Sequence, residues 1–343
     1  MILVLNQSMT EQQQNDLCLK LQQQGFYTRL VSQYGQLILS VDGNGEDDLA
    51  REAHSWSGVV EVIPGRYSYY LASRKCNRRN SIVKIGSAPG SQVVFGGEAA
   101  IIIAGPCAIE TEESALSLAH KIKAAGCNVF RSMIFKPRSS PYSFQGLGRA
   151  GIAILDEIRK QTGLLILTEV REPLEAELVA DHADILQIGT RNMSNFQLLK
   201  HIGQMKKPVV LKRGMGATFE ELLCAAEYVL SHGNSDVILC ERGIRTFEHY
   251  TRFSLDIEAV PAIKELSHLP IIIDPSHASG RSSMIASLTL AGIAAGADGI
   301  MLEVHEFPEE SFSDGTQSIN PASFGEILEK TRKVAQAVGR RLS

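Results

Sequence analysis

The chain has 343 residues, of which 44% are hydrophobic and 21% charged, and its formal net charge at pH 7 is -4. These proportions are ordinary for a globular protein, and the slight acidity argues against the basic footprint of a nucleic-acid-binding protein. No apolar run approaches the roughly 18 residues of a membrane helix, and the short apolar start lacks the basic flank of a secretory signal. Six scattered cysteines argue against a disulfide framework. We therefore expect a cytoplasmic protein that concentrates its functional cations in a pocket.

The first 72 residues predict a small α+β domain. Strands are expected at 1–6, 26–33, 37–42 and 59–63, with helices at 10–24 and 46–56. Gly25 and Gly58 follow the two helices, and Tyr34-Gly35-Gln36 suits a hairpin turn. This strand and helix order is typical of ferredoxin-like domains. We interpret residues 1–72 as a domain with a regulatory or assembly role, and residues 73–92 as a solvated linker.

From residue 93 to 343, short apolar runs alternate with segments of helix length. Strands are predicted at 100–104, 128–134, 164–169, 184–188, 208–212, 236–240, 270–274 and 298–303. Helices are predicted near 111–125, 149–162, 172–182, 194–205, 218–232, 255–267, 281–296 and 321–338. Ser194 and Thr218 each precede a Gln or Glu three residues on, as in a capping box, and Asn320 precedes Pro321 as an N-cap.

Eight strand-helix units in about 250 residues match the size and rhythm of a (β/α)8 TIM barrel. An open, doubly wound sheet is the rival fold. Its dinucleotide-binding members carry GxGxxG after the first strand, whereas this chain has Gly105-Pro106-Cys107 there. Pro106 also removes a backbone N–H that would face a phosphate. We therefore predict an α/β protein with a catalytic TIM barrel at 93–343, preceded by the ferredoxin-like domain.

Basic residues follow several predicted strands, at the end of a barrel where catalytic groups lie. They are Arg131, Lys136, Arg138, Arg191, Lys212, Arg213, Arg242 and Arg245. Their mutual repulsion would oppose folding unless anions bind there or acids such as Glu169, Glu241 and Asp274 pair with them. Arginine matches the oxygens of phosphate and carboxylate groups in a bidentate way. The sequence therefore predicts a site for phosphate or carboxylate groups.

Four possible metal ligands lie at the same end. Cys107 ends the first predicted strand, His277 follows the seventh, Glu303 ends the eighth, and Asp314 lies in the loop beyond. Taken singly, these are ordinary residues: a buried thiol, a loop imidazole, an ion-pair partner and a turn residue. In a closed barrel the eighth strand meets the first, so the four converge. Thiolate, imidazole and carboxylate together suit Mn, Fe, Co or Zn. The role of His305, nearby, stays open.

Several runs of consecutive residues resemble those of a known enzyme family. They are Ala104-Gly105-Pro106-Cys107, residues 136–146 beginning Lys136-Pro137-Arg138, Leu211-Lys212-Arg213-Gly214, Cys240-Glu241-Arg242-Gly243, Asp274-Pro275-Ser276-His277, Glu303-Val304-His305 and Ser313-Asp314-Gly315. In this order, over 93–343, the chain resembles the 3-deoxy-D-arabino-heptulosonate 7-phosphate (DAHP) synthases, specifically the type I beta subclass. These are metal-dependent transferases that condense phosphoenolpyruvate with erythrose 4-phosphate. The reaction is the first step of the shikimate pathway toward aromatic amino acids.

The resemblance implies roles for particular residues. The implied metal ligands are Cys107, His277, Glu303 and Asp314. The implied phosphoenolpyruvate contacts are Arg131, Lys136, Arg191, Lys212 and Arg242. Erythrose 4-phosphate would face Lys136, Pro137, Arg138 and Ser139, where Ser139 keeps the hydroxyl of the family's threonine. The implied catalytic residues are Lys136, Cys107 and His277, with Lys136 as a hypothetical proton donor to the new hydroxyl.

The N-terminal region is similar to the ferredoxin-like, ACT-like regulatory domain fused to some members of the subclass. The resemblance implies feedback inhibition by tyrosine or phenylalanine. It also implies a homo-tetramer, with a loop from Arg29 to Gly35, including Ser32, near the effector.

Three alternative functions are compatible with parts of this pattern. The related 3-deoxy-D-manno-octulosonate 8-phosphate synthases use arabinose 5-phosphate and carry Asn-Arg where this chain has Pro137-Arg138. Pro137 and the N-terminal domain favour the four-carbon sugar. A non-catalytic amino-acid sensor with an inactive barrel would have lost site residues that this chain keeps. A class II aldolase would explain neither the many cations nor the absence of its His-rich ligand set.

Overall fold

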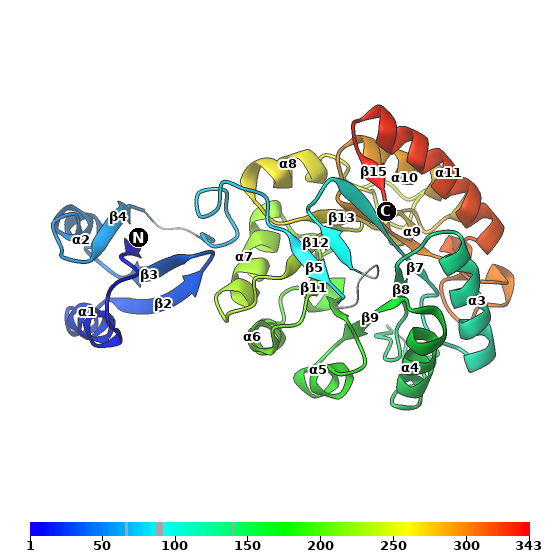
Figure 1. Cartoon of the computed structure of the whole chain (residues 1–343), viewed down its shortest axis with the longest axis horizontal. Coiled ribbons are helices and arrows are strands. Elements are labelled where there is room, and N and C mark those ends of the chain that lie inside the picture. Colours follow the sequence, from blue (N-terminus) through cyan, green and yellow to red (C-terminus); the bar gives the residue numbers. More distant parts are fainter. Residues whose placement is uncertain (66–67, 87–91, 139) are drawn as a thin grey trace.

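The computed structural model describes residues 1–65, 68–86, 92–138 and 140–343. Figure 1 shows a small sheet with two helices beside a large barrel. The small sheet contains β1 (Ile2–Leu5), β2 (Tyr27–Gln33), β3 (Gln36–Asp42) and β4 (Val59–Ile63) in the order β2-β3-β1-β4. Its strands pair antiparallel, and α1 (Glu11–Gln23) and α2 (Glu46–Ala53) complete the βαββαβ order that the sequence predicts.

The two faces of this small sheet bury different side chains, as the alternation along a strand requires. Leu3 and Leu39 pack with Leu21 of α1 and Leu49 of α2 in a separate core. Ile2 and Ile38 point the other way and join the main hydrophobic cluster of the barrel. Leu3 and Leu39 therefore build the small domain's own core, while Ile2 and Ile38 hold it against the barrel.

The predicted TIM barrel is confirmed. Its strands are β7 (Ala99–Gly105), β8 (Val129–Arg131), β9 (Leu165–Val170), β10 (Ile185–Ile188), β11 (Val209–Lys212), β12 (Val237–Glu241), β13 (Ile271–Ile273) and β14 (Gly299–Glu303). Neighbouring strands pair in parallel. The barrel closes where β14 pairs with β7 and Glu303 lies opposite Gly105.

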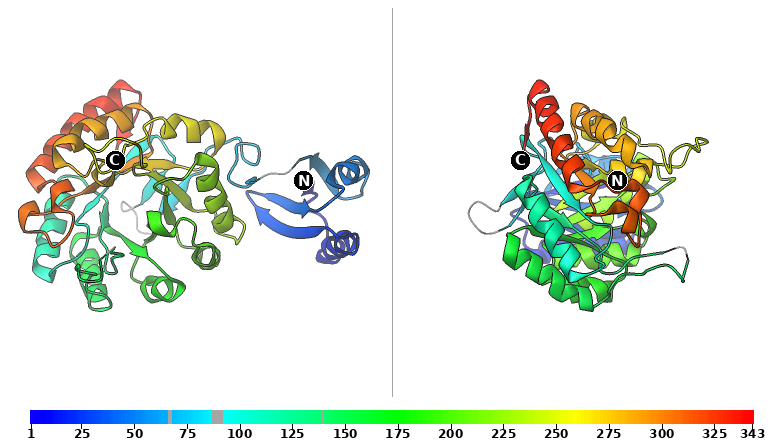
Figure 2. Two further views of the ribbon diagram at one scale, coloured as in Figure 1. Left: turned by 180° about the vertical axis from the view of Figure 1, so that it is seen from behind. Right: turned by 90° about the vertical axis from the view of Figure 1, so that its right-hand side faces the viewer.

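Helices surround the barrel on the outside (Figure 2). They are α3 (Glu112–Ala124), α4 (Ala150–Thr162), α5 (Pro173–Val179), α6 (Phe196–Met205), α7 (Phe219–Leu230), α8 (Ala259–Leu266), α10 (Ser282–Ala294) and α11 (Pro321–Ala337). Shorter pieces are α9 (Pro275–Ser279), η1 (Thr190–Asn192), η2 (Pro308–Glu310) and η3 (Gly315–Gln317). Within the described ranges, none of the helices combines the length and apolar character needed to cross a membrane.

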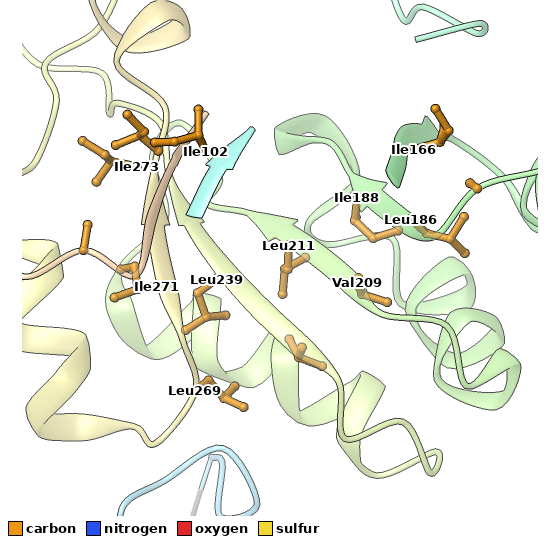
Figure 3. Close-up of a cluster of buried hydrophobic side chains, with 14 of the residues drawn as sticks. Ile102, Ile166, Leu186, Ile188, Val209, Leu211, Leu239, Leu269, Ile271 and Ile273 are labelled. Atoms are coloured by element: carbon orange, nitrogen blue, oxygen red, sulfur yellow. The ribbon is translucent and has the colours of Figure 1, made fainter. Parts of the chain in front are cut away.

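Strand residues alternate between two cores. Ile102, Ile166 and Leu211 face outward against the helices, in the cluster drawn in Figure 3. Their neighbours Ile103 and Val210 point inward and fill the barrel. Because both faces of the strands are covered by apolar groups, the strands read as nearly continuous hydrophobic runs. Catalytic side chains are left to the strand ends and the loops beyond them.

A hairpin of β5 (Val83–Ile85) and β6 (Val93–Phe95) differs from the solvated tether expected at 73–92. Val83 and Phe95 are fully buried and pack with the inward-facing residues of the barrel. They cover apolar side chains that water would otherwise reach, so burial, rather than flexibility, fixes this segment. The alternation of Val83, Lys84 and Ile85 was the available signal.

A Phe95→Ala variant is expected to lower the free energy of unfolding by about 3–5 kcal/mol, because it removes a buried ring and leaves a cavity. Urea unfolding followed by circular dichroism measures the loss. Phe247→Ala is the matched control, since Phe247 is 93% exposed, and its effect should stay within about 0.5 kcal/mol. Equal effects of the two substitutions would mean that the hairpin does not seal the barrel.

Two of the three predicted helix starts are confirmed. Thr218 forms the capping box of α7, and Asn320 caps α11 with Pro321 at its first position. The prediction for Ser194 is wrong, because Asn195 caps α6 and its side chain accepts from Leu198 N. An additional strand, β15 (Arg341–Leu342), pairs with the start of β7 and was not predicted.

Candidate active site

A cavity of about 260 Å³ lies at the carboxyl ends of the barrel strands. Residues from all eight barrel strands or the loops after them line it, which is where the strand-end rule placed the functional groups. Its predicted site residues are Cys107, Lys136, Pro137, Arg138, Arg191, Lys212, Arg242, His277 and Asp314. Of the other predicted residues, Arg131 and Glu303 are fully buried, and Ser139 lies outside the described residues.

The four proposed metal ligands converge. One donor atom from each of Cys107, His277, Glu303 and Asp314 lies within 4.8 Å of the others. The Cys107 Sγ atom is 3.1 Å from Asp314 Oδ2, and His277 Nε2 is 3.3 Å from Glu303 Oε1. Lys136 Nζ donates to both Cys107 Sγ and Asp314 Oδ2. A thiol, an imidazole and two carboxylates in this arrangement fit a divalent transition ion.

Buried partners orient these four side chains. His277 Nδ1 lies 2.7 Å from Asp274 Oδ2, which leaves Nε2 toward the cluster. Asp274 is itself paired with Lys212. Burial lowers the pKa of His277 to about 4, against the opposing pull of Asp274 and Glu303. The imidazole is therefore neutral near pH 7, the form that binds metals. Burial raises the pKa of the Cys107 thiol, so metal binding there would displace a proton.

The other half of the cavity can bind anions. Lys136, Lys212 and Arg242 are each about 95% buried or more. Nε and Nη2 of Arg131, and Nη1 of Arg242, have no hydrogen-bond partner among the described residues. Buried donors are normally paired. Such groups beside further cations are well suited to the oxygens of a phosphate or carboxylate.

The structure separates cations that the sequence treats alike. Arg213 is buried, and its Nη1 lies 2.9 Å from Glu241 Oε2 and 2.7 Å from Asp256 Oδ2. It therefore holds the loops together and does not line the cavity. Arg245 is exposed. Only distances in the folded chain reveal this division, because each of these arginines follows a strand.

Sequence reasoning missed Arg252, which lines the cavity from the loop after β12. Its Nη1 atom lies 2.9 Å from Gln317 Oε1 and 3.6 Å from Asp314 Oδ1. Gln317 was missed too, although it is 2% exposed and donates to Glu303. Neither residue adjoins a strand end, so the strand-end rule gave no signal for them.

His305, whose role was open, contacts the loop after β7. Its Nε2 atom is 3.4 Å from Glu110 Oε2, while Glu110 Oε1 accepts from Ser311 Oγ and from Phe312 N. These contacts join the loop that follows Cys107 to the loop that leads to Asp314. His305 is thus placed beside the cluster and outside the four-donor group.

A closed barrel with buried cations and four clustered donors at its strand ends defines an enzyme site for phosphorylated or carboxylated substrates. A profile of the DAHP synthetase I family matches residues 79–339, and the chain belongs to this family. A relative from Thermotoga maritima, named phospho-2-dehydro-3-deoxyheptonate aldolase, is 43% identical over 302 residues, which make up 88% of each chain.

Solved structures give the same result. A crystal structure of a phospho-2-dehydro-3-deoxyheptonate aldolase (DAHP synthase) from Thermotoga maritima covers 100% of this chain and 99% of its own, with a TM-score of 0.79 and 39% identity. More distant relatives carry another name. One from Syntrophotalea carbinolica, named 2-dehydro-3-deoxyphosphooctonate aldolase, is 31% identical over 67% of this chain and 88% of its own.

Proposed function

We propose that this chain condenses phosphoenolpyruvate with D-erythrose 4-phosphate and water, giving DAHP and inorganic phosphate. This is the 3-deoxy-7-phosphoheptulonate synthase reaction. The family membership supports this activity. The observation that carries it is the cavity itself, in which buried, incompletely paired cations adjoin four metal-type donors. The phosphates of both substrates and the carboxylate of phosphoenolpyruvate must be desolvated in this cavity. The clustered cations offset the free-energy cost of that desolvation.

Cys107, His277, Glu303 and Asp314 would hold the divalent cation. Their mixed donor set suits Mn, Fe, Co or Zn. When bound, the ion supplies Lewis-acid polarisation of the sugar's aldehyde. His277 is kept neutral, and Asp274 and Lys212 fix its orientation. The protein thus holds four donors close together, and binding of an ion would displace the Cys107 proton and the contacts that Lys136 makes with Cys107 and Asp314.

We assign the substrate groups to the remaining cavity residues. Arg131, Arg191, Lys212 and Arg242, with Lys136, would hold the phosphate and carboxylate of phosphoenolpyruvate, and Pro137, Arg138 and Ser139 would face erythrose 4-phosphate. C3 of the enol bonds to the aldehyde carbon, water adds at C2, and phosphate leaves by C–O cleavage. Nearby charges raise the pKa of Lys136 above its ordinary value, although burial alone would lower it. Lys136 is therefore an ammonium near pH 7 and carries a proton that it can donate to the new hydroxyl, although the raised pKa makes it a weaker acid than an ordinary lysine.

Phosphate release from phosphoenolpyruvate by metal-stripped protein, with Mn²⁺ added back, tests this proposal. We expect metal-dependent turnover with erythrose 4-phosphate and at least about 100-fold less with arabinose 5-phosphate, because Pro137 stands where the octulosonate enzymes have asparagine. Turnover with the five-carbon sugar would move the assignment to the octulosonate reaction. Absence of turnover with both sugars, together with retained metal binding, would favour a non-catalytic sensor.

We further propose that an aromatic amino acid, tyrosine or phenylalanine, regulates this activity. A second cavity, of about 370 Å³, lies between the small sheet and helices α6 and α7. Arg29, Lys200 and Glu227 line it together with Tyr70 and Tyr228, and the Glu227 carboxylate also accepts from Leu71 N and Ala72 N. Such a lining can pair both charges of an amino acid and pack its ring. The family resemblance implied a loop from Arg29 to Gly35 near the effector, but Arg29 and Ser32 lie in β2, and Ser32 is not among the lining residues.

Inhibition by tyrosine and by phenylalanine tests the regulatory proposal. Arg29→Met is expected to raise the half-inhibitory concentration about tenfold or more, because a charge-assisted hydrogen bond is lost. Arg51→Met on α2 is the matched control, since its side chain is 79% exposed, and should leave inhibition unchanged. Equal inhibition of wild type and Arg29→Met would remove this cavity as the effector site. A cytoplasmic homo-tetramer completes the proposal, and sedimentation velocity measures its mass.

A further inference from the structure

Gln317 lies between two charged side chains of the site. It is 2% exposed and belongs to η3, three residues after Asp314. Its Nε2 donates to Glu303 Oε2, and its Oε1 accepts from Arg252 Nη1 at 2.9 Å. A neutral amide thus connects a proposed metal ligand to an arginine at the cavity.

Chemistry allows one orientation of this amide. A guanidinium only donates hydrogen bonds, and an ionised carboxylate only accepts them. Exchanging the oxygen and nitrogen of Gln317 would set its N–H groups against Arg252 and its oxygen against Glu303. Arg252 therefore fixes the direction in which Gln317 presents its donor.

Glu303 is held at both carboxylate oxygens. Oε1 lies 2.8 Å from Arg131 Nη1 and 3.3 Å from His277 Nε2. Oε2 accepts from Gln317. Arg131 comes from β8 and Gln317 from the loop after β14, so two elements set the plane of the carboxylate. Without Gln317, only the contacts at Oε1 among the described residues would hold the carboxylate.

Arg252 is itself anchored beside the cluster. Its backbone N–H donates to Ser279 O, and that of Phe253 donates to Ala278 O, which ties the loop to α9 and thus to His277. Its side chain is 38% exposed and lines both the main cavity and an adjoining one. It therefore joins the solvent-accessible mouth of the site to buried Gln317.

We propose that Gln317 is a positioning residue that orients Glu303 for the divalent cation, and that Arg252 acts on the cluster through Gln317. The inference rests on the proposed metal site. Hydrogen-bond partners of metal ligands typically contribute 10–100-fold to metal affinity. Metal affinity in this chain thus depends on an arginine at the cavity mouth that is not a ligand.

Equilibrium dialysis of the full-length protein against buffered Mn²⁺ tests this relay, in which Arg252 acts on Glu303 through Gln317. Gln317→Met, which keeps the length but removes donor and acceptor, should weaken Mn²⁺ binding about 10–100-fold. Gln336→Met, on the exposed face of α11, is the matched control and should bind as wild type does. Arg252→Met should weaken binding less, and Arg252→Lys should recover part of that loss. Because Arg252 is partly exposed, its variants test the relay even where Gln317→Met does not fold.

A double variant separates the relay from a direct effect of Arg252 on Asp314. If Arg252 acts through Gln317, Gln317→Met/Arg252→Met binds Mn²⁺ no more weakly than Gln317→Met alone. Losses that multiply would overturn the relay. Wild-type affinity in Gln317→Met would remove its positioning role while leaving the metal site intact. Failure of wild type itself to bind a divalent ion would reject the metal site and the relay together.

Discussion

A Cys107→Ala variant is expected to lose more than about 100-fold in divalent-metal affinity and to lose turnover with phosphoenolpyruvate and erythrose 4-phosphate. Cys107 supplies the one sulfur donor among the four clustered side chains. Loss of a direct ligand should exceed the 10–100-fold effect of losing a partner of a ligand. Dialysis against Mn²⁺ gives the affinity, and phosphate release gives the turnover.

The matched control is Cys18→Ala, because Cys18 lies in α1, away from the barrel. It should change neither quantity. The rival explanation of Cys107 is that it merely fills space as a small apolar side chain. That explanation predicts reduced stability with unchanged metal affinity, so an unchanged dissociation constant for Mn²⁺ in Cys107→Ala would contradict the metal assignment.

Arg131→Met is expected to lower the free energy of unfolding by about 3–5 kcal/mol and to weaken phosphoenolpyruvate binding. Arg131 and Glu303 are both fully buried and lie 2.8 Å apart. Removing one partner leaves the other charge buried with less compensation, which is costly. Arg131 also holds two donors that have no partner in the described part of the chain. Urea unfolding and the KM for phosphoenolpyruvate measure the two effects.

Arg341→Met provides the comparison for stability. Arg341 pairs with Glu98 where both side chains are at least 74% exposed, and such pairs contribute about 0–1 kcal/mol. A similarly small loss in Arg131→Met would show that the buried Glu303 carboxylate does not depend on the charge of Arg131. An unchanged KM would separate Arg131 from substrate binding.

The sequence was sufficient for the barrel because each strand is covered on both faces and therefore reads as a short apolar run. In a closed barrel the eighth strand meets the first, so the sequence predicts that Cys107 lies near Glu303, and β14 does pair with β7. The elements of the small domain could also be predicted from the sequence, since glycines and a turn separate its strands and helices. These features depend on neighbours in the chain or on closure of the barrel.

Other features depend on contacts between residues far apart in the chain, which no local sequence pattern indicates. The hairpin at Val83 and Phe95 is held by the barrel interior, while basic residues before it resemble a tether. Arg213 forms ion pairs with Glu241 and Asp256, whereas Nη1 of Arg242 has no hydrogen-bond partner in the described part of the chain. Gln317 lies in a loop, and no spacing pattern in the sequence indicates that a single glutamine there belongs to the site.

The most direct test of the account is anomalous diffraction at the manganese edge from crystals grown with Mn²⁺ and phosphoenolpyruvate. We expect one strong peak among Cys107, His277, Glu303 and Asp314, with the phosphate and carboxylate of phosphoenolpyruvate on Lys212, Arg242 and their neighbouring cations. A peak elsewhere, for example between His305 and Glu110, or phosphoenolpyruvate bound away from these cations, would contradict it.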